Sequence, residues 1–355
     1  MANFQMSIEA QRRYQRLEEK YKLLYTDPRH CEPMVMVGIP VQGCADPNEQ
    51  LHDPAKMLDA YEKRISAHIE LGDDTLPSIR VEFGTAQIAA AFGCEVREMP
   101  RSLPACGSHI LKEAGDIWNM KLPTLKDGLV PLLDKYTEYY QEHMSPGMVI
   151  QHPDVQSSFN SAHLIRGNDI LYDFYDDPGA LRQLLKMVTD YMILFTEHTK
   201  SAISKDKEWF HDSGGFWKGG ARISNCTLQI VSPELYEEFI MPEDIRYLKA
   251  IGGGAIHYCG SHPGVLEEMY RIPEAHMLQI DSEYHDMIEV CDKCPLEKTV
   301  MFCDWSVEHG NREWFPKLLS GRIPEKKNIV IYAKAYSMEE GKRIYHDIKN
   351  ALLKS

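Results

Sequence analysis

The sequence lacks the features that would assign it to a membrane, a secretory route or a nucleic acid. No stretch approaches a run of about 18 apolar residues, so a transmembrane helix is not expected. Lys and Arg number 39 against 53 Asp and Glu, and the net charge of -14 disfavours nucleic-acid binding through the overall field. The first residues have neither the basic start nor the apolar block of a signal peptide. We therefore expect a cytoplasmic protein that acts on a small molecule.

The sequence also lacks internal repeats, low-complexity segments and any long linker. We expect one domain over residues 1–355, with residues 1–30 as an N-terminal helical extension. The nine cysteines are odd in number and scattered, so a disulfide framework is not expected. Cys291 and Cys294 have the spacing of zinc and redox sites, but no second such pair stands at finger spacing. This pair is either a structural or redox site or an incidental one.

Strands alternate with helices through the second half of the chain. Strands are expected at 255–258, 276–280, 299–302 and 328–333, and helices at 264–270 and 338–353, the last of them capped by Ser337. Earlier in the chain, 152–163 is expected to be a loop after a strand, Asp177 and Pro178 open a helix, and 209–220 is expected to be a turn region rich in glycine and aromatic residues. A continuous apolar run at 34–40 is typical of a further strand buried on both faces. The alternation favours a parallel sheet with right-handed crossovers, and the length suits a single α/β barrel. We therefore predict a (β/α)₈ TIM barrel.

A possible metal site stands at the end of one predicted strand. His257 and Cys259 would project to the same side at strand spacing, and both are good zinc ligands. Two later strands end at Asp281 and Cys303, and the carboxyl ends of neighbouring barrel strands lie close together. The pattern predicts zinc held by His257, Cys259 and Cys303, with Asp281 or water in the fourth position. The alternative for Asp281 alone is a solvated strand-end carboxylate or a helix cap, and Cys303 alone is more often a buried apolar residue than a ligand.

Three polar residues are candidate catalytic groups. Arg80 stands in a polar loop after Asp74, where it would clamp a substrate carboxylate or form an internal salt bridge. Asp74 is a candidate pocket residue in the same loop. Asp212 follows an apolar strand and would act as a general acid or base, or belong to a turn built by Asp and Gly.

Three further residues are candidates for binding a flat cofactor. His163 falls on the presumed rim of the barrel, and Trp217 and Tyr336 would line a pocket. Aromatic rings at strand ends also serve in ordinary packing, which is the alternative for both.

Several segments resemble the uroporphyrinogen decarboxylase superfamily, particularly its members related to corrinoid-dependent methyltransferases. The resemblance covers most of the chain beyond about residue 70. It is carried by the segments 74–80 with 83–85, 232–236 with Phe239 and Pro242, and 256–260. It implies the barrel fold and, by analogy, a homodimer. The arginine-rich motif with which the true decarboxylases grip porphyrinogen carboxylates is replaced here by 39–44, which has no arginine.

The methyltransferase branch is more similar. Its members hold zinc with His-x-Cys and a distant cysteine, and the zinc activates a thiol that takes a methyl group from a methyl-corrinoid protein. His257 and Cys259 match that motif, whereas Cys303 lies one strand earlier than the distant cysteine of the family. Cobalamin-independent methionine synthase is similar in adding a carboxylate from the following strand, which implies a ligand role for Asp281.

These observations lead to one main hypothesis and two alternatives. The main one is a zinc-dependent methyltransferase that moves a methyl group between a corrinoid, carried by a partner protein, and a thiol acceptor. The first alternative is decarboxylation of a tetrapyrrole, with Asp74, Arg80 and Asp212 in the pocket. The second is a non-catalytic barrel that binds a corrinoid or tetrapyrrole.

Overall fold

The computed structural model describes residues 4–304 and 314–353. Its main sheet has seven parallel strands in the order β1-β13-β12-β11-β10-β9-β6. Their bounds are β1 Met34–Gly38, β6 Val155–Gln156, β9 Ala221–Ser224, β10 Gly254–Tyr258, β11 Ala275–Asp281, β12 Thr299–Cys303 and β13 Ile329–Lys334. The remaining strands form the pairs β2 (Ser78–Ile79) with β5 (Val149–Ile150), β3 (Val96–Arg97) with β4 (Ala105–Cys106), and β7 (Trp209–Asp212) with β8 (Gly215–Lys218).

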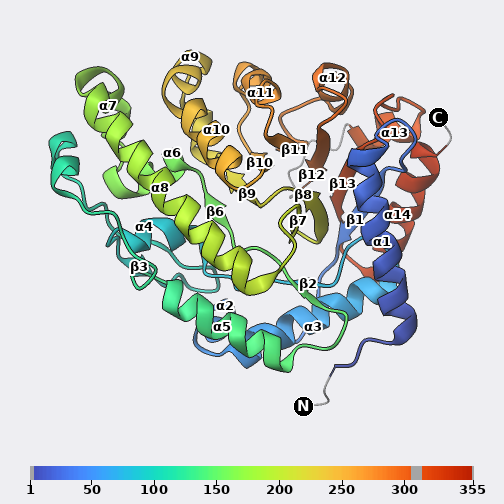
Figure 1. Cartoon of the computed structure of the whole chain (residues 1–355). Helices are drawn as coiled ribbons and strands as arrows, with labels where there is room; N and C mark the ends of the chain where they lie inside the picture. Colours follow the sequence, from blue (N-terminus) through green and yellow to red (C-terminus); the bar gives the residue numbers. More distant parts are fainter. Residues whose placement is uncertain (1–3, 305–313, 354–355) are drawn as a thin grey trace.

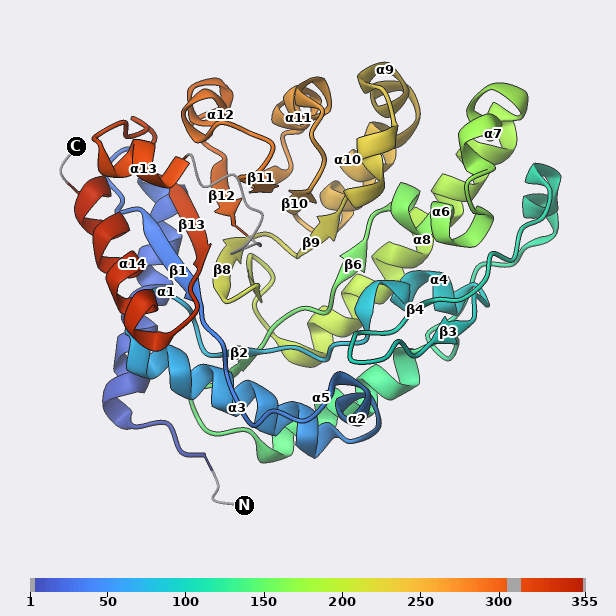
Figure 2. The same cartoon turned by 180° about the vertical axis from the view of Figure 1, so that it is seen from behind.

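Helices surround these strands on the outside (Figures 1 and 2). The α-helices are α1 Ile8–Thr26, α2 Pro47–His52, α3 Pro54–Leu71, α4 Gln87–Ala91, α5 Val130–His143, α6 Ser158–Arg166, α7 Ile170–Asp176, α8 Pro178–Ile203, α9 Pro233–Leu235, α10 Met241–Ala250, α11 Pro263–Tyr270, α12 Met287–Lys293, α13 Trp314–Leu319 and α14 Met338–Leu352. Three 3₁₀ helices, η1 Gly84–Ala86, η2 Ala114–Asn119 and η3 Cys226–Ile230, and one π-helix, η4 Tyr236–Ile240, complete the described elements. No described helix is long and apolar enough to cross a membrane.

The two faces of the main sheet differ in polarity. Side chains of directly paired residues point to the same face, and His257 pairs with Ser224 on one side and Gln279 on the other. That face, which we call the inner face, also carries Arg222 and Cys303. The opposite face is apolar and packs against the helices, with residues such as Ile223, Ile256, Leu278, Val300 and Ile331 fully or almost fully buried. The polar inner face is therefore where chemistry is possible.

The parallel α/β architecture is confirmed, but a closed eight-stranded barrel is not observed among the described strands. Among the described strands, β1 is an edge of the main sheet, and β2 pairs with β5 alone. The amides of Val35 and Val37 donate instead to the carboxylates of Asp74 and Asp73, each at 2.8 Å. One backbone hydrogen bond, from the Asp74 amide to the Val35 carbonyl at 3.0 Å, accompanies them. In a closed barrel, backbone carbonyls of a neighbouring strand would accept the hydrogen bonds of these β1 amides. Here the carboxylates of Asp73 and Asp74 accept them instead, and we call this edge of β1 the seam.

The predicted N-terminal helix forms α1, which packs against strand β8. Its Tyr21 is fully buried, meets the ring of Trp217 edge-on at 5.4 Å and donates to the Asp74 carbonyl at 3.0 Å. α1 therefore covers the β7–β8 hairpin beside the seam. All nine cysteines are free thiols, as the lack of a disulfide pattern predicts.

Candidate functional site

A group of three metal-ligand side chains lies at the carboxyl ends of β9 and β10. The ligand atoms of Cys226, His257 and Cys259 all lie within 4.8 Å of one another. His257 is on the inner face of β10, Cys259 follows that strand directly, and Cys226 opens η3 just after β9. The predicted His-x-Cys pair therefore gains its third member from the neighbouring strand. We call these three residues the metal centre.

The loop after β10 is held in place by contacts that leave Cys259 partly accessible. Tyr258 is buried, and its hydroxyl accepts a hydrogen bond from the His262 amide at 3.1 Å. The imidazole of His285 contacts the Gly260 carbonyl at 2.8 Å. A Cβ at position 260 would lie 2.4 Å from the Tyr258 ring, so only glycine lets the chain turn back this closely. Cys259 is thus presented by a fixed turn rather than by a loose loop.

A buried polar network fixes the start of η3. The Asn225 amide donates to the His257 carbonyl at 2.8 Å, which ties the residue before Cys226 to β10. The Asn225 side chain donates to Asp244 at 2.7 Å, and the Tyr236 hydroxyl bonds the same carboxylate oxygen at 3.1 Å. Burial raises the pKa of Asp244 to about 7, although both hydrogen bonds favour its charged form. Tyr236 lies in the π-helix η4, a backbone distortion found frequently at functional sites.

The thiols of the metal centre influence each other. The hydrogen bond from Cys226 lowers the pKa of the Cys259 thiol, and His257 acts in the same direction, although burial opposes both. The pKa of Cys226 is raised, because its thiol serves as the donor and is largely buried. The arrangement favours a thiolate at Cys259, which is the form that binds a metal.

The donor set fits zinc. Two sulfurs and one imidazole nitrogen are the ligands that Zn²⁺ prefers, and tetrahedral bonds of about 2.0–2.3 Å place ligand atoms roughly 3.5–3.8 Å apart. A group whose ligand atoms already lie within 4.8 Å needs only a small contraction to reach that geometry. Three protein ligands leave a fourth position, and an open position distinguishes catalytic zinc sites from structural ones.

The other two predicted ligands lie elsewhere on the inner face. Cys303 pairs with Asp281 across β12 and β11, and neither belongs to the metal centre. Cys303 is 1% exposed, and burial raises the pKa of its thiol well above the ordinary value, with the Asp281 charge adding to the shift. Cys226 occupies the third position for which Cys303 was predicted, and ligand roles for Cys303 and Asp281 stay predictions.

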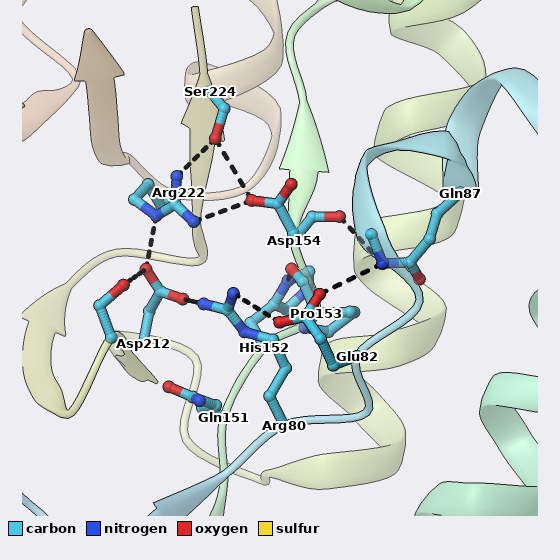
Figure 3. Close-up of polar contacts among 12 residues, drawn as sticks. Arg80, Glu82, Gln87, Gln151, His152, Pro153, Asp154, Asp212, Arg222 and Ser224 are labelled. Carbon is cyan, nitrogen blue, oxygen red and sulfur yellow. Dashed lines mark hydrogen bonds and ion pairs between the residues drawn. The ribbon is translucent and has the colours of Figure 1, made fainter. Parts of the chain in front are cut away.

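Arg80 and Asp212 meet in a buried ionic network (Figure 3). The network reaches Ser224, which pairs with His257 of the metal centre in the neighbouring strand. Asp212 pairs with Arg80 through one oxygen and with the Arg222 Nε through the other at 2.5 Å. Arg222 extends the chain of charges to Asp154 at 2.8 Å and to the Ser224 hydroxyl. Guanidinium groups and carboxylates alternate along this network, so its charges largely compensate one another. Arg222 and Ser224 belong to β9, the strand that leads to Cys226.

The network holds its carboxylates in the charged form. Burial alone would raise the pKa of Asp212, but Arg222 and Arg80 outweigh it and hold that pKa at about 2. The same balance lowers the pKa of Asp154, through Arg222 first and Arg80 second. Asp212 is therefore an anion that orients arginines at neutral pH, and acid–base catalysis by Asp212 stays a prediction.

Asp74 lies at the seam rather than among these groups. Its carboxylate accepts from the Val35 amide and from Lys349 at 2.8 Å each, and from the Tyr345 hydroxyl at 3.2 Å. Every contact of this side chain supports the edge of β1 or the docking of α14. Its predicted role in catalysis is not tested by these contacts.

The three predicted cofactor-binding residues stand in different surroundings. Trp217 is fully buried in β8 and donates to the Asp212 carbonyl at 2.8 Å. His163, on α6, bonds the side chain of Asn168 at 2.9 Å. Tyr336 is 58% exposed at the start of α14. No described contact joins them, and cofactor binding by these residues stays a prediction.

Cys291 and Cys294 are both buried free thiols around the end of α12.

Cys226 was missed because its strand was missed. The glycine and aromatic residues of 209–220 predict a turn region, and no strand was predicted at the position of β9, which follows it. The signal that could have found the residue is the alternation of Arg222 and Ser224 with apolar neighbours, two positions before a cysteine. A strand there would put Cys226 at a carboxyl end, where metal ligands are expected.

Comparisons with known proteins concern the fold. No protein-family model matches the sequence, and no curated protein matches it. A solved structure described as a methyltransferase from Methanosarcina mazei is similar, with a TM-score of 0.68 and 14% sequence identity, over 95% of this chain and 98% of that chain. At this identity the likeness shows a shared fold, which extends over nearly the whole chain.

Proposed function

We propose that the protein is a zinc-dependent methyltransferase that transfers a methyl group to a thiol. The observation that carries the proposal is the group of Cys226, His257 and Cys259, whose two sulfurs and one nitrogen are one ligand short of a tetrahedral set. The likeness in fold to a protein described as a methyltransferase supports it. Bound zinc would supply Lewis acidity that keeps a thiol acceptor in its thiolate form at neutral pH.

The reaction requires a good methyl donor, and a methyl-corrinoid presented by a partner protein meets that need. The acceptor sulfur forms a bond to the methyl carbon, and the bond between carbon and donor breaks with its electron pair left on the donor. In this proposal the chain's own residues orient the acceptor. His257 and the Arg222 network form one inner wall of polar groups, and the Tyr258 turn holds Cys259 beside it.

Metal content and methyl transfer together test the proposal. We expect about one zinc per chain in protein purified without chelator, and loss of most of it in Cys226→Ser, Cys259→Ser and His257→Ala variants. Cys44→Ser is the matched control, because Cys44 is also a partly exposed free thiol but lies outside the metal centre. The same variants should lose transfer of methyl from methylcobalamin to a simple thiol.

The result can also turn against the proposal. Full zinc content in Cys226→Ser would remove Cys226 from the centre. Metal-free protein that decarboxylates uroporphyrinogen would replace methyl transfer with the decarboxylase function.

A further inference from the structure

A further pair of neighbouring thiols lies outside the metal centre, on the short hairpin formed by β3 and β4. The hairpin lies at the outside of the molecule, beside α4 (Figure 2). Val96 in β3 pairs with Cys106 in β4, and Cys94 lies two positions before Val96. The Gly107 amide donates to the Glu95 carbonyl at 2.8 Å, which extends the antiparallel ladder towards Cys94. Because side chains alternate along a strand, Cys94 and Cys106 lie on the same face as diagonal neighbours.

The two thiols contact each other but differ in environment. Cys94 donates a hydrogen bond to Cys106, which raises the pKa of Cys94, and burial adds to that rise. The same bond lowers the pKa of Cys106, although burial opposes it. Cys94 is 4% exposed, and its sulfur also lies 3.7 Å from the Leu164 carbonyl of α6, whereas Cys106 is only partly buried. One thiol is therefore accessible and favours the thiolate form, and the other lies behind it.

The surroundings of this pair suit redox chemistry better than metal binding. Over residues 4–304 and 314–353, the metal centre is the one group of three or more metal-ligand side chains, so Cys94 and Cys106 have no third ligand beside them. The pair Cys291 and Cys294 differs, because both thiols are buried and burial raises the pKa of each. Reversible disulfides form where an accessible thiolate has a second thiol within reach. Cys94 and Cys106 meet both conditions.

Formation of the bond requires only a small movement of the backbone. Cα atoms joined by a disulfide lie about 4.4–6.8 Å apart, and diagonal neighbours across a strand pair lie about 7–8 Å apart. Cys94 precedes the two-residue strand β3 and follows Gly93, whose φ of 105° is in the region that glycine adopts freely. A Cβ added at Gly93 would meet nothing within 4 Å, so the chain has space to shift there. Cys94 can approach Cys106 while β4 stays packed against η1.

We propose that Cys94 and Cys106 are a redox-modification site, at which they form a reversible disulfide with a low-molecular-weight disulfide such as glutathione disulfide as the oxidant. The Cys106 thiolate attacks one sulfur of the oxidant, and the S–S bond breaks with its electron pair left on the first glutathione thiolate. The Cys94 thiol then loses its proton to solvent and attacks the Cys106 sulfur, and the second glutathione thiolate leaves. The protein thiols are oxidised by two electrons, and the oxidant is reduced to two thiols that take up the two protons.

The proposal is independent of the proposed function, because it involves no metal and no methyl donor. In reducing compartments, protein disulfides are usually transient ones that sense redox conditions or act in catalysis. A disulfide that forms and breaks with the glutathione ratio belongs to that class. It would join the two strands of the hairpin covalently across the loop at 98–104.

Incubation of the full-length protein in buffers with different ratios of reduced to oxidised glutathione, followed by acid quenching, alkylation and peptide mapping, tests the proposal. We expect a cross-linked peptide that contains Cys94 and Cys106 and is lost on return to reduced glutathione. Cys94→Ser should stop the reaction halfway, so that Cys106 accumulates as an adduct with one glutathione. In Cys106→Ser, the buried Cys94 should stay unmodified. Cys44→Ser, at another partly exposed thiol, should form the same cross-link as the wild type.

Two results would overturn the proposal. One is the absence of the cross-link from the wild type at every glutathione ratio. The other is accumulation of the glutathione adduct on Cys106 of the wild type, because Cys94 would then fail to displace the glutathione. Both are read from the wild type, so they hold even if a variant does not fold. Peptides with Cys226 and Cys259 are mapped in the same samples, and their oxidation and the zinc content report separately on the metal centre.

Discussion

At the scale of single residues, the metal centre depends on side chains that touch no metal. Asn225 is fully buried between β9 and η3, and its amide and side chain tie it to the His257 carbonyl and to Asp244. The residue after it is Cys226, so these two bonds set the direction in which that thiol points. Partners of this kind are worth about 10–100-fold in metal affinity in zinc proteins.

We therefore predict that Asn225→Ala lowers the affinity for zinc about tenfold, because residue 225 loses its side-chain bond to Asp244 while its backbone bond to His257 and all three ligands remain. Competition with a chromophoric chelator measures the affinity. Asn350→Ala, at an exposed position of α14, serves as the control. Unchanged affinity in Asn225→Ala would show that η3 is held by its backbone alone.

Contacts between residues close in sequence could be predicted at this scale, whereas contacts between distant residues could not. His257 and Cys259 are two positions apart in one strand, so their convergence follows from local geometry, and the structure brings them together. Cys226 is more than thirty positions away from Cys259 and joins them only through the β9–β10 pairing. Arg80 and Asp212 were predicted separately, and nothing in their sequence neighbourhoods indicates that they pair across 132 residues. Contacts of this kind are decided by tertiary packing.

At the scale of elements, segments with strong local signals were predicted well. α8 begins at Pro178 with Asp177 as its cap, and α14 begins after Ser337, both as the capping residues indicate. Short elements were predicted less well. The loop expected at 152–163 contains β6 and six of the nine residues of α6. The turn region expected at 209–220 is the hairpin β7–β8, which turns at Ser213 and Gly214 as expected there. Two-residue strands such as β6 have too few positions for an alternation to be recognised.

The edge of β1 provides a test at this scale. Asp74→Ala should lower the free energy of unfolding by about 3 kcal/mol, since it leaves the Val35 amide and the Lys349 ammonium without their shared acceptor. Chemical denaturation measures the loss, and Asp347→Ala, on the partly exposed face of α14, gives the baseline for a surface carboxylate. Zinc content should stay the same.

The opposite pattern would restore the catalytic interpretation of Asp74. If the variant kept its stability but lost methyl transfer, the carboxylate would act in the reaction rather than at the strand edge.

At the scale of the whole molecule, the metal centre is a small addition to a large core. The buried apolar residues extend from α1 to α14, and the metal centre involves only the ends of β9 and β10. Zinc should therefore stabilise a fold that already exists, unlike the small zinc domains that unfold without metal.

Removal of zinc by a chelator should lower the apparent melting temperature without unfolding the protein at room temperature. Free zinc at a thousand times its dissociation constant adds about 4 kcal/mol, which for a chain of this size corresponds to roughly 5 °C. Scanning calorimetry with and without chelator measures the shift. The Cys259→Ser variant should melt at the lower temperature in both conditions. Complete unfolding on chelation would mean that the metal organises the fold.

The class of fold was accessible from sequence because alternating strands and helices repeat along the chain, whereas closure of the sheet was not. Closure depends on whether two particular edges pair, and here the carboxylates of Asp73 and Asp74 take the hydrogen bonds that a neighbouring strand would otherwise take. No periodicity in the sequence carries that information.

The seam also sets the metal centre apart from the edge of the main sheet. The metal centre is built on β9 and β10, each bonded to strands on both sides, whereas β1 is bonded to a described strand on one side only. A strand between two neighbours is held by two ladders of backbone hydrogen bonds, and an edge strand by one. A local opening at the seam would therefore leave the ligand geometry of the metal centre undisturbed.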